Sequence, residues 1–372
     1  LSQAEAIADL INAETASQAR LAREQLHGKL SRAVQELGEP LRDVLAEIEA
    51  FIDFPEEDIE LKSIEAWTKV IQNVRARIGL LLESFQSGRL QREGLDVAIV
   101  GLPNAGKSSL LNQLVGEDRV IVSAIAGTTR DTIEEHISLD GQLIKLWDTA
   151  GISPNYDQGP ESSAENINEH STEHINERRH LPDELEKLGV ERSWKRLERA
   201  DVAVFLLDGG VGFHAQEQLL NQVLEAVPQV ILACNKLDLL DDEQIAQLRS
   251  FLNERYQRET VFISALERIG IGELQERLRE FAFADENPEA ELHSHKNAIL
   301  GSGLVSSKRH FDALRDAETT LLGVIQNLHD RLPPELLSID LRRALSSLEE
   351  IVGVTNTEDI LGRIFSRFCI GK

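Results

Sequence analysis

The sequence predicts an α/β P-loop domain, with a mainly parallel sheet and helices on both faces, inserted into an all-α helical domain. Short β-branched runs alternate with amphipathic stretches between residues 95 and 281, and such alternation is typical of a parallel sheet covered on both faces. A phosphate-binding motif follows the first run. On both sides of this region apolar residues recur at three- and four-residue steps, which indicates helices. We expect strands at Leu95–Val100, Ile144–Trp147, Val202–Leu207, Val230–Cys234 and Val261–Ile263.

The pattern divides the chain into three segments. They are residues 1–92 (helical domain, first part), residues 93–286 (P-loop domain) and residues 287–372 (helical domain, second part, ending in Cys-Ile-Gly-Lys). Neither flank carries enough periodic segments to close a bundle by itself, so we expect the two flanks to form one domain. Pro40 lies inside the first long apolar stripe, and it predicts a kink or a fresh helix start near Gly38.

Composition narrows the class of protein. Lys and Arg number 39 against 64 Asp and Glu, a net charge of −25, so contact with RNA would need a local basic patch or a basic partner. No apolar run approaches the roughly 20 residues of a membrane span. The first residues lack the features of a signal peptide, and two cysteines are too few for a disulfide framework. We therefore expect a cytoplasmic protein with no membrane contact. Methionine is absent, and we expect that the first residue is not where a gene product starts.

Gly101–Ser108 matches the P-loop pattern G-x-x-x-x-G-K-[ST], with an expected strand before it and a helix after it. Backbone N–H groups of such a loop hold phosphates, Lys107 reaches the β- and γ-phosphate oxygens, and Ser108 binds Mg²⁺. A chance glycine-rich turn is the alternative, and the strand–loop–helix context disfavours it. The expected nucleotide contacts in this loop are Asn104, Ala105, Gly106, Lys107, Ser108 and Ser109.

Two further motifs carry residues that can contact the γ-phosphate and its Mg²⁺ ion. Asp148-Thr149-Ala150-Gly151 follows the second expected strand; its aspartate can hold the Mg²⁺ shell and its glycine N–H can meet the γ-phosphate. Gly127-Thr128-Thr129-Arg130-Asp131 lies between this motif and the P-loop. In that position Thr129 is the expected hydroxyl on Mg²⁺, within a switch segment that orders around the γ-phosphate.

Asn235-Lys236-Leu237-Asp238 closes an expected strand and selects the base. The carboxylate of Asp238 can accept from both N1–H and the exocyclic amine of guanine, a donor pair that adenine lacks. Asn235 can bond the base edge, and the Lys236 stem can cover the face of the base. The segment Ser264-Ala265-Leu266 would contact the guanine oxygen through backbone N–H groups. These motifs predict a G domain that binds GTP and GDP.

The motifs together resemble one family, the tRNA-modifying GTPase MnmE, also called TrmE. The resemblance covers nearly the whole chain. Its most specific parts are Pro103–Ser109, Ile125–Asp131 and Leu361–Lys372.

The resemblance implies a homodimer whose G domains meet across the nucleotide, with K⁺ in the interface. The cation would supply transition-state charge, as an arginine finger does elsewhere. By the same likeness its ligands would be the side chains of Asn104 and Thr128 and the backbone of Ser123 and Ile125, with Ala124 and Ala126 in the same nucleotide-binding loop.

Hydrolysis needs a group that orients water. Ile152 follows the Asp148–Gly151 motif, and its side chain cannot hydrogen-bond, unlike the glutamine of Ras-like enzymes. The resemblance assigns this role to Glu186, which precedes Gly189-Val190-Glu191-Arg192, so Glu186 and Lys107 are the expected catalytic residues. The alternative for Glu186 is an ordinary exposed helix-start glutamate. The polar stretch 152–185, which we expect to be poorly ordered, departs from the family in being longer than its usual switch segment, and the alignment of Glu186 depends on how this stretch is placed.

The resemblance also implies the reaction that hydrolysis would serve. Family members act with a flavoprotein, MnmG, in a heterotetramer, and add an aminomethyl or carboxymethylaminomethyl group at carbon 5 of the tRNA wobble uridine. Their one-carbon donor is 5,10-methylene- or 5-formyl-tetrahydrofolate, which Lys372 would reach. The family's N-terminal folate-binding domain has no counterpart in this sequence, so we expect that the chain neither holds folate nor modifies tRNA by itself.

Alternative functions for the chain, and alternative roles for some of its residues, remain open. A ribosome-assembly GTPase is disfavoured by the net charge of −25 and the lack of a basic C-terminal domain. A nucleotide-gated dimerisation scaffold would hydrolyse GTP only incidentally. Cys369 is either catalytic or an inert C-terminal thiol. His170, His174 and His180 are better explained as exposed residues than as metal ligands, because no cysteine or fixed scaffold accompanies them.

Overall fold

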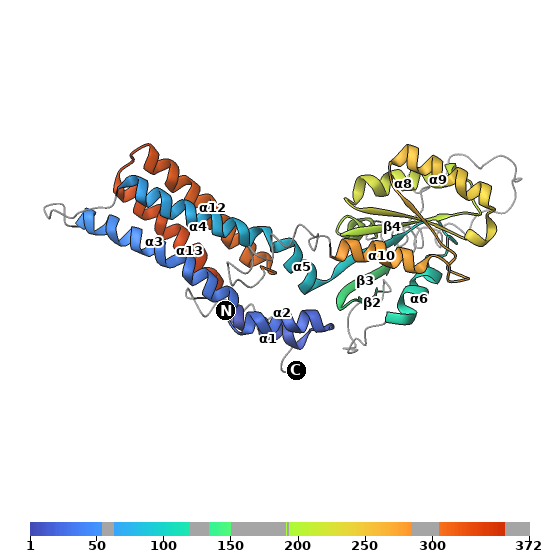
Figure 1. The fold of residues 1–372 in the computed structure, drawn as a ribbon, viewed down its shortest axis with the longest axis horizontal. Coiled ribbons are helices and arrows are strands. Elements are labelled where there is room, and N and C mark those ends of the chain that lie inside the picture. The colour runs from blue at the N-terminus through green and yellow to red at the C-terminus, as the bar shows by residue number, and fades with distance from the viewer. Residues whose placement is uncertain (54–62, 119–133, 150–190, 192, 284–304, 354–372) are drawn as a thin grey trace, which may run out of the picture. The chain divides into compact units, whose positions relative to one another are not determined.

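The computed structural model describes residues 1–53, 63–118, 134–149, 191, 193–283 and 305–353. The chain forms two compact units. One comprises Leu1–Glu93 with Phe283–Lys372, and the other comprises Gly94–Ala282. The first is built from helices and the second from a sheet flanked by helices (Figure 1). The predicted fold class, an α/β domain inserted into an all-α domain, is confirmed.

The helical unit is a bundle to which both flanks contribute. Its long helices are α3 (Lys29–Asp53), α4 (Ile64–Glu83), α12 (Lys308–His329) and α13 (Pro334–Val352), and its shorter helices are α1 (Ser2–Ile11), α2 (Ala16–Leu26) and α5 (Phe85–Glu93). One apolar cluster joins the long helices, with Leu41, Ile71, Leu321 and Leu341 each 0% exposed. Because the core draws on both ends of the chain, neither flank can bury its apolar face without the other. No helix among the described residues is both long and apolar enough to cross a membrane.

Helix α3 runs through Pro40 without interruption, so a fresh helix start near Gly38 is excluded, and a kink there stays a prediction. Proline removes one N–H donor from a helix, the partner of the carbonyl four residues earlier. That carbonyl belongs to Glu36, an exposed residue, where water can replace the missing donor. The buried face of α3, which includes Leu37, Leu41 and Val44, keeps its contacts, and this packing outweighs the local cost of proline.

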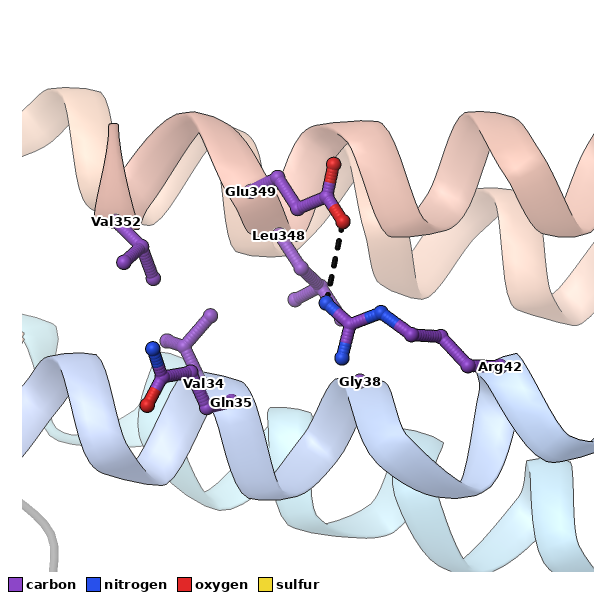
Figure 2. A pocket seen from close by; sticks show the side chains of 7 residues that line it. All are labelled: Val34, Gln35, Gly38, Arg42, Leu348, Glu349 and Val352. Atoms are coloured by element: carbon purple, nitrogen blue, oxygen red, sulfur yellow. Dashed lines mark hydrogen bonds and ion pairs between the residues drawn. The ribbon is translucent and has the colours of Figure 1, made fainter. Parts of the chain in front are cut away.

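An ion pair joins the two flanks across α3 and α13. Arg42 donates from Nη2 to Oε1 of Glu349 at 3.1 Å, over a small groove of about 50 Å³ (Figure 2). Gly38 leaves room for the guanidinium, because a Cβ there would lie 3.2 Å from Arg42 Nη1. The groove is lined by Val34, Gln35, Gly38, Arg42, Leu348, Glu349 and Val352.

A second polar cluster ties α1 to the bundle. Arg309 donates to both carboxylate oxygens of Glu5, at 3.0 and 3.1 Å, and to the carbonyl of Glu350 at 2.7 Å. Burial by itself would raise the pKa of Glu5, but hydrogen bonds from His310 and Arg309 outweigh it and lower that pKa to about 2. Burial lowers the pKa of His310, so Arg309 supplies the positive charge of this cluster at neutral pH.

The α/β unit is a six-stranded sheet in the order β2-β3-β1-β4-β5-β6. All neighbouring pairs are parallel except β2 and β3, which are antiparallel. The strands are β1 (Leu95–Val100), β2 (Glu134–Leu139), β3 (Gln142–Asp148), β4 (Val202–Asp208), β5 (Val230–Asn235) and β6 (Thr260–Phe262). The helices whose bounds lie within the described residues are α6 (Lys107–Asp118), α8 (His214–Ala226), α9 (Asp242–Tyr256) and α10 (Ile271–Ala282), with a 3₁₀ turn at Leu237–Leu239.

Parallel pairing brings the carboxyl ends of five strands, β3, β1, β4, β5 and β6, to one edge of the sheet. Ile99 of β1 pairs with Asp148 of β3, and Asp208 of β4 pairs with Asn235 of β5. The P-loop, the Asp148 motif and the Asn235 motif each begin where one of these strands ends. Ligands of open α/β sheets bind at this edge, so the fold itself assembles the candidate site.

Leu321 and Leu322 are adjacent in α12 and test the shared core as a matched pair. Leu321 is 0% exposed and Leu322 is 50% exposed. We expect Leu321→Ala to lower the free energy of unfolding of the helical unit by about 2–5 kcal/mol, because it leaves a cavity in the core. Leu322→Ala should lower it by less than about 0.5 kcal/mol. Urea unfolding followed by circular dichroism at a helical wavelength measures both, and equal losses would contradict the assigned core.

Candidate nucleotide-binding site

The P-loop begins where β1 and β4 approach each other closely. A Cβ at Gly101 would lie 2.5 Å from the carbonyl oxygen of Leu206, so only glycine fits there. The loop then turns through two residues with positive φ, Asn104 at 64° and Gly106 at 95°. Asparagine and glycine are the residues that adopt this conformation most readily. The turn delivers the chain into α6, whose first residue is Lys107.

Lys107 folds back over the loop that precedes it. Its Nζ donates to the carbonyls of Gly101 and Leu102, both at 3.0 Å. Burial lowers the pKa of Lys107, and the charge of Asp148 acts in the opposite direction. The ammonium is thus held against the backbone of the loop by two carbonyls, and its contact with a phosphate stays a prediction.

Ser108 and Asp148 meet at the start of α6. Ser108 donates from Oγ to Oδ2 of Asp148 at 2.9 Å. The other carboxylate oxygen, Asp148 Oδ1, is buried and has no hydrogen-bond partner among the described residues. Thr149 is 0% exposed and its hydroxyl donates to the carbonyl of Ile99 at 2.8 Å. Thr149 therefore fixes the motif to β1, while Asp148 keeps a buried oxygen that needs a partner.

The amide of Asn235 joins three loops. Nδ2 donates to the carbonyl of Ala105 in the P-loop at 2.8 Å, and Oδ1 accepts from the N–H of Ala265 at 2.9 Å. Asn235 is 3% exposed. A Cβ at Gly106 would lie 2.2 Å from Asn235 Nδ2, so this contact also depends on glycine at that position. In this structure both polar groups of Asn235 bind protein, and its contact with a base edge stays a prediction.

The residues expected to recognise the base lie beside this amide. Asp238 is exposed, and its Oδ1 accepts from Ser264 Oγ at 2.6 Å. Lys236 has a positive φ of 67° and lies between the two motif residues. Leu266 is 82% exposed. The N–H of Ala265 is engaged by Asn235, so donation to a guanine oxygen would require that bond to be shared or exchanged.

Comparison with known proteins places this arrangement in a family. A family profile described as the MnmE helical domain matches residues 1–369. The chain belongs to the MnmE family. A protein named "tRNA modification GTPase MnmE" from Christiangramia forsetii is 35% identical over 385 residues, which cover 100% of this chain and 73% of that protein. Another of the same name, from Desulforamulus reducens, is 38% identical over 376 residues, covering 100% of this chain and 72% of that protein.

A solved structure also matches part of the chain. The G domain of the T. maritima FeoB iron transporter is 25% identical, with a TM-score of 0.35, and the match covers 50% of this chain and 98% of that chain.

The predicted site residues fall into two groups. The structure brings the P-loop, Asp148, Thr149 and the Asn235, Asp238 and Ser264 motifs to one edge of the sheet. The others lie outside the described residues, including the expected K⁺ ligands on the second loop, the water-orienting glutamate and the C-terminal lysine. Those residues are Ser123, Ala124, Ile125, Ala126, Gly127, Thr128, Thr129, Ala150, Gly151, Glu186 and Lys372. The polar stretch 152–185 also lies outside the described residues.

Two buried polar residues at this edge belong to no motif of the sequence. Asp208 ends β4 and is 4% exposed, and Gln216 in α8 is 1% exposed. The signal for Asp208 was an aspartate directly after the apolar run Val202–Leu207 and before two glycines. Nothing in the sequence distinguishes Gln216 from the exposed polar residues of an amphipathic helix.

Replacement of Gly106 by alanine and replacement of Gly116 by alanine are expected to change the stability of the α/β unit in opposite directions. At Gly106 the added Cβ would meet Asn235 and φ is positive, whereas at Gly116, exposed in α6, no atom of the described residues outside the local helix backbone lies within 4 Å of the added Cβ. We expect Gly106→Ala to destabilise the α/β unit by about 1–3 kcal/mol through strain. Gly116→Ala should stabilise it by up to about 1 kcal/mol, because alanine is the better helix former. Thermal unfolding of the two variants measures this, and a shift of the same sign in both would contradict the assigned loop geometry.

Proposed function

We propose that this chain is a GTP hydrolase that drives modification of the tRNA wobble uridine. The observation that carries the proposal is the single sheet edge at which the P-loop, Asp148 and the Asn235–Asp238 motif meet. Membership of the MnmE family, whose cited relatives are named tRNA modification GTPases, supports the tRNA part.

Nucleotide binding would use groups that are already in place. The P-loop N–H groups and Lys107 would hold the phosphates. Asp238 would accept from the guanine base, and its position is supported by the hydrogen bond from Ser264. A carboxylate fixed in this way discriminates strongly, because a base without the matching donors leaves it unsatisfied.

The residues present fit a Mg²⁺ ion. Magnesium prefers oxygen ligands, and Asp148 Oδ1 is a buried carboxylate oxygen with no hydrogen-bond partner among the described residues. Ser108 Oγ lies 2.9 Å from the other oxygen of the same carboxylate. Ser108 and Asp148, with Thr129 from the second loop, would hold the ion. When bound, it would neutralise charge on the β- and γ-phosphates.

Hydrolysis would be completed by a second copy of the chain. We propose that the G domains dimerise with K⁺ between them, bound by Asn104, Ser123, Ile125 and Thr128, and that Glu186 orients the attacking water. Of these residues, Asn104 lies in the described part of the chain, where it is exposed with φ of 64°. That placement leaves its side chain accessible to a partner surface.

The larger reaction would be addition of an aminomethyl or carboxymethylaminomethyl group at carbon 5 of the wobble uridine. It would require the flavoprotein MnmG in a heterotetramer and a folate one-carbon donor. The charge of −25 on this chain suits a division of labour in which a more basic partner contacts most of the tRNA backbone.

Asp238→Asn should exchange guanine for xanthine nucleotides. The amide keeps an oxygen for the Ser264 hydroxyl but loses the charge that accepts from guanine, and its N–H can donate to the 2-oxo group of xanthine. We expect affinity for GDP to fall at least about 100-fold and affinity for XDP to rise, since two charged hydrogen bonds are lost. Asp242→Asn, an exposed residue at the start of α9, should change GDP affinity less than about twofold. Equilibrium titration with labelled nucleotides measures these affinities. If the unaltered chain bound ATP as tightly as GTP, the assigned base site would be wrong.

GTP hydrolysis should depend on K⁺ and on protein concentration. We expect turnover in KCl to exceed that in NaCl at equal ionic strength by at least about tenfold, because the cation supplies transition-state charge. GDP affinity, measured as the control, should be the same in both salts. Turnover per chain should rise as protein concentration rises. Equal turnover in both salts would remove the ion from the mechanism, and a low, concentration-independent rate would favour the dimerisation scaffold.

A further inference from the structure

Asp208 is a buried carboxylate at the edge of the candidate site. It ends β4 next to Asn235 on β5 and is 4% exposed. Its Oδ2 accepts from Nζ of Lys236 at 2.6 Å, and its Oδ1 accepts from the N–H of Gly210 at 2.9 Å. Both oxygens therefore have a donor, and one of these donors belongs to the base-recognition motif.

Gln216 holds the backbone of Asp208 in place. Its Oε1 accepts from the N–H of Asp208 at 2.8 Å, and its Nε2 donates to the carbonyl of Asp208 at 3.0 Å. Nε2 also donates to the carbonyl of Val211 at 3.2 Å. Because Gln216 is 1% exposed and lies in α8, the carboxylate is mounted on a rigid support rather than on a free loop.

Lys236 combines an uncommon backbone conformation with a side chain bound to Asp208. Its φ of 67° and ψ of 39° are left-handed, which costs a residue with a Cβ roughly 1–2 kcal/mol. The side chain is 32% exposed while its Asp208 partner is 4% exposed. The ammonium is thus drawn against the buried carboxylate, and part of the methylene stem stays accessible to a ligand.

Asp238 lies two residues after Lys236 and carries the second carboxylate of the region. Its Oδ1 accepts from Ser264, and the residue is exposed. If the Lys236 ammonium were released from Asp208, Asp238 would be a carboxylate within the same short turn with which it could pair. Such a pair would occupy the acceptor that guanine N1–H and the exocyclic amine need.

We propose that Asp208 is a positioning residue for guanine recognition: it holds the Lys236 ammonium away from Asp238 and leaves the Lys236 stem lying across the base site. This inference rests on the proposed GTP site. Asp208 touches no nucleotide in this scheme and acts through Lys236. The competing explanation is that Asp208 only terminates β4 through its bond with Gly210, a role that does not involve Lys236.

A double-mutant cycle on GDP affinity separates these explanations. Asp208→Asn removes the charge that holds the ammonium, and Lys236→Met removes the ammonium but keeps the stem. We expect Asp208→Asn to weaken GDP binding about tenfold in the unaltered chain, and by less than about twofold when Lys236→Met is already present. The ratio of GDP to IDP affinity should also fall in Asp208→Asn, because the released ammonium competes for Asp238, which recognises the amine that IDP lacks.

Asp140→Asn is the matched control, since Asp140 also pairs with a basic side chain, Arg279, at 2.6 Å. Asp140 lies in the turn between β2 and β3, at the opposite end of β3 from Asp148, and its replacement should leave GDP affinity unchanged. Equal loss from Asp208→Asn in both backgrounds, or no loss in the unaltered chain, would overturn the proposal. Near-normal binding by the double variant relative to Lys236→Met shows that the fold is intact. Failure of the unaltered chain to bind GDP would instead overturn the proposed function.

Discussion

The buried amide of Asn235 is the contact on which the candidate site depends. It donates to Ala105 of the P-loop and accepts from Ala265 after β6, so it connects loops that lie 30 and 130 residues away along the chain. Leaving either group of a buried amide unsatisfied costs about 1–3 kcal/mol, which makes separate movement of these loops unfavourable. Gly106 is part of the same constraint, because a side chain there would collide with the amide. The loops are therefore fixed relative to one another before a ligand arrives, and less ordering remains to oppose binding.

Local patterns predict the parts of this fold that depend on local physics. The P-loop could be located because its chemistry requires glycine and lysine at fixed spacing, and β1, β4 and β5 could be located because both of their faces are buried. No strand is predicted at Glu134–Leu139, because β2 is the outermost strand of the sheet and four of its six residues are exposed or half-exposed. At Pro40 the local rule allowed a kink or a fresh helix start, and the fresh start does not occur because the burial of one face of α3 in the bundle outweighs the lost hydrogen bond.

In the site, the sequence could name residue types but not the partners of their polar atoms. Asn235 carries groups suited to a base edge, yet its amide binds two backbone groups of the protein. Thr149 lies inside a phosphate-reading motif, yet its hydroxyl binds Ile99. The buried side chain of Gln216 bonds the backbone N–H and carbonyl of Asp208. Contacts between a side chain and a backbone of this kind occur at no fixed distance along the sequence, so no motif predicts them. Hydrogen-bond partners are decided by tertiary packing, which periodicity does not encode.

The charge balance of the chain explains why such a site would use mobile cations. With a net charge of −25, the long-range field opposes a polyphosphate, and attraction has to come from groups close to the ligand. Of the two lysines of the described site, Lys236 is paired with the carboxylate of Asp208, whereas Lys107 is bound by two neutral carbonyls and keeps its charge for a phosphate. Backbone N–H groups carry only partial charges. The proposed Mg²⁺ and K⁺ ions would bring full charges, and the net charge of −25 favours the approach of cations. This charge balance supports the proposal that bound cations would act beside Lys107 and supply further positive charge for phosphoryl transfer.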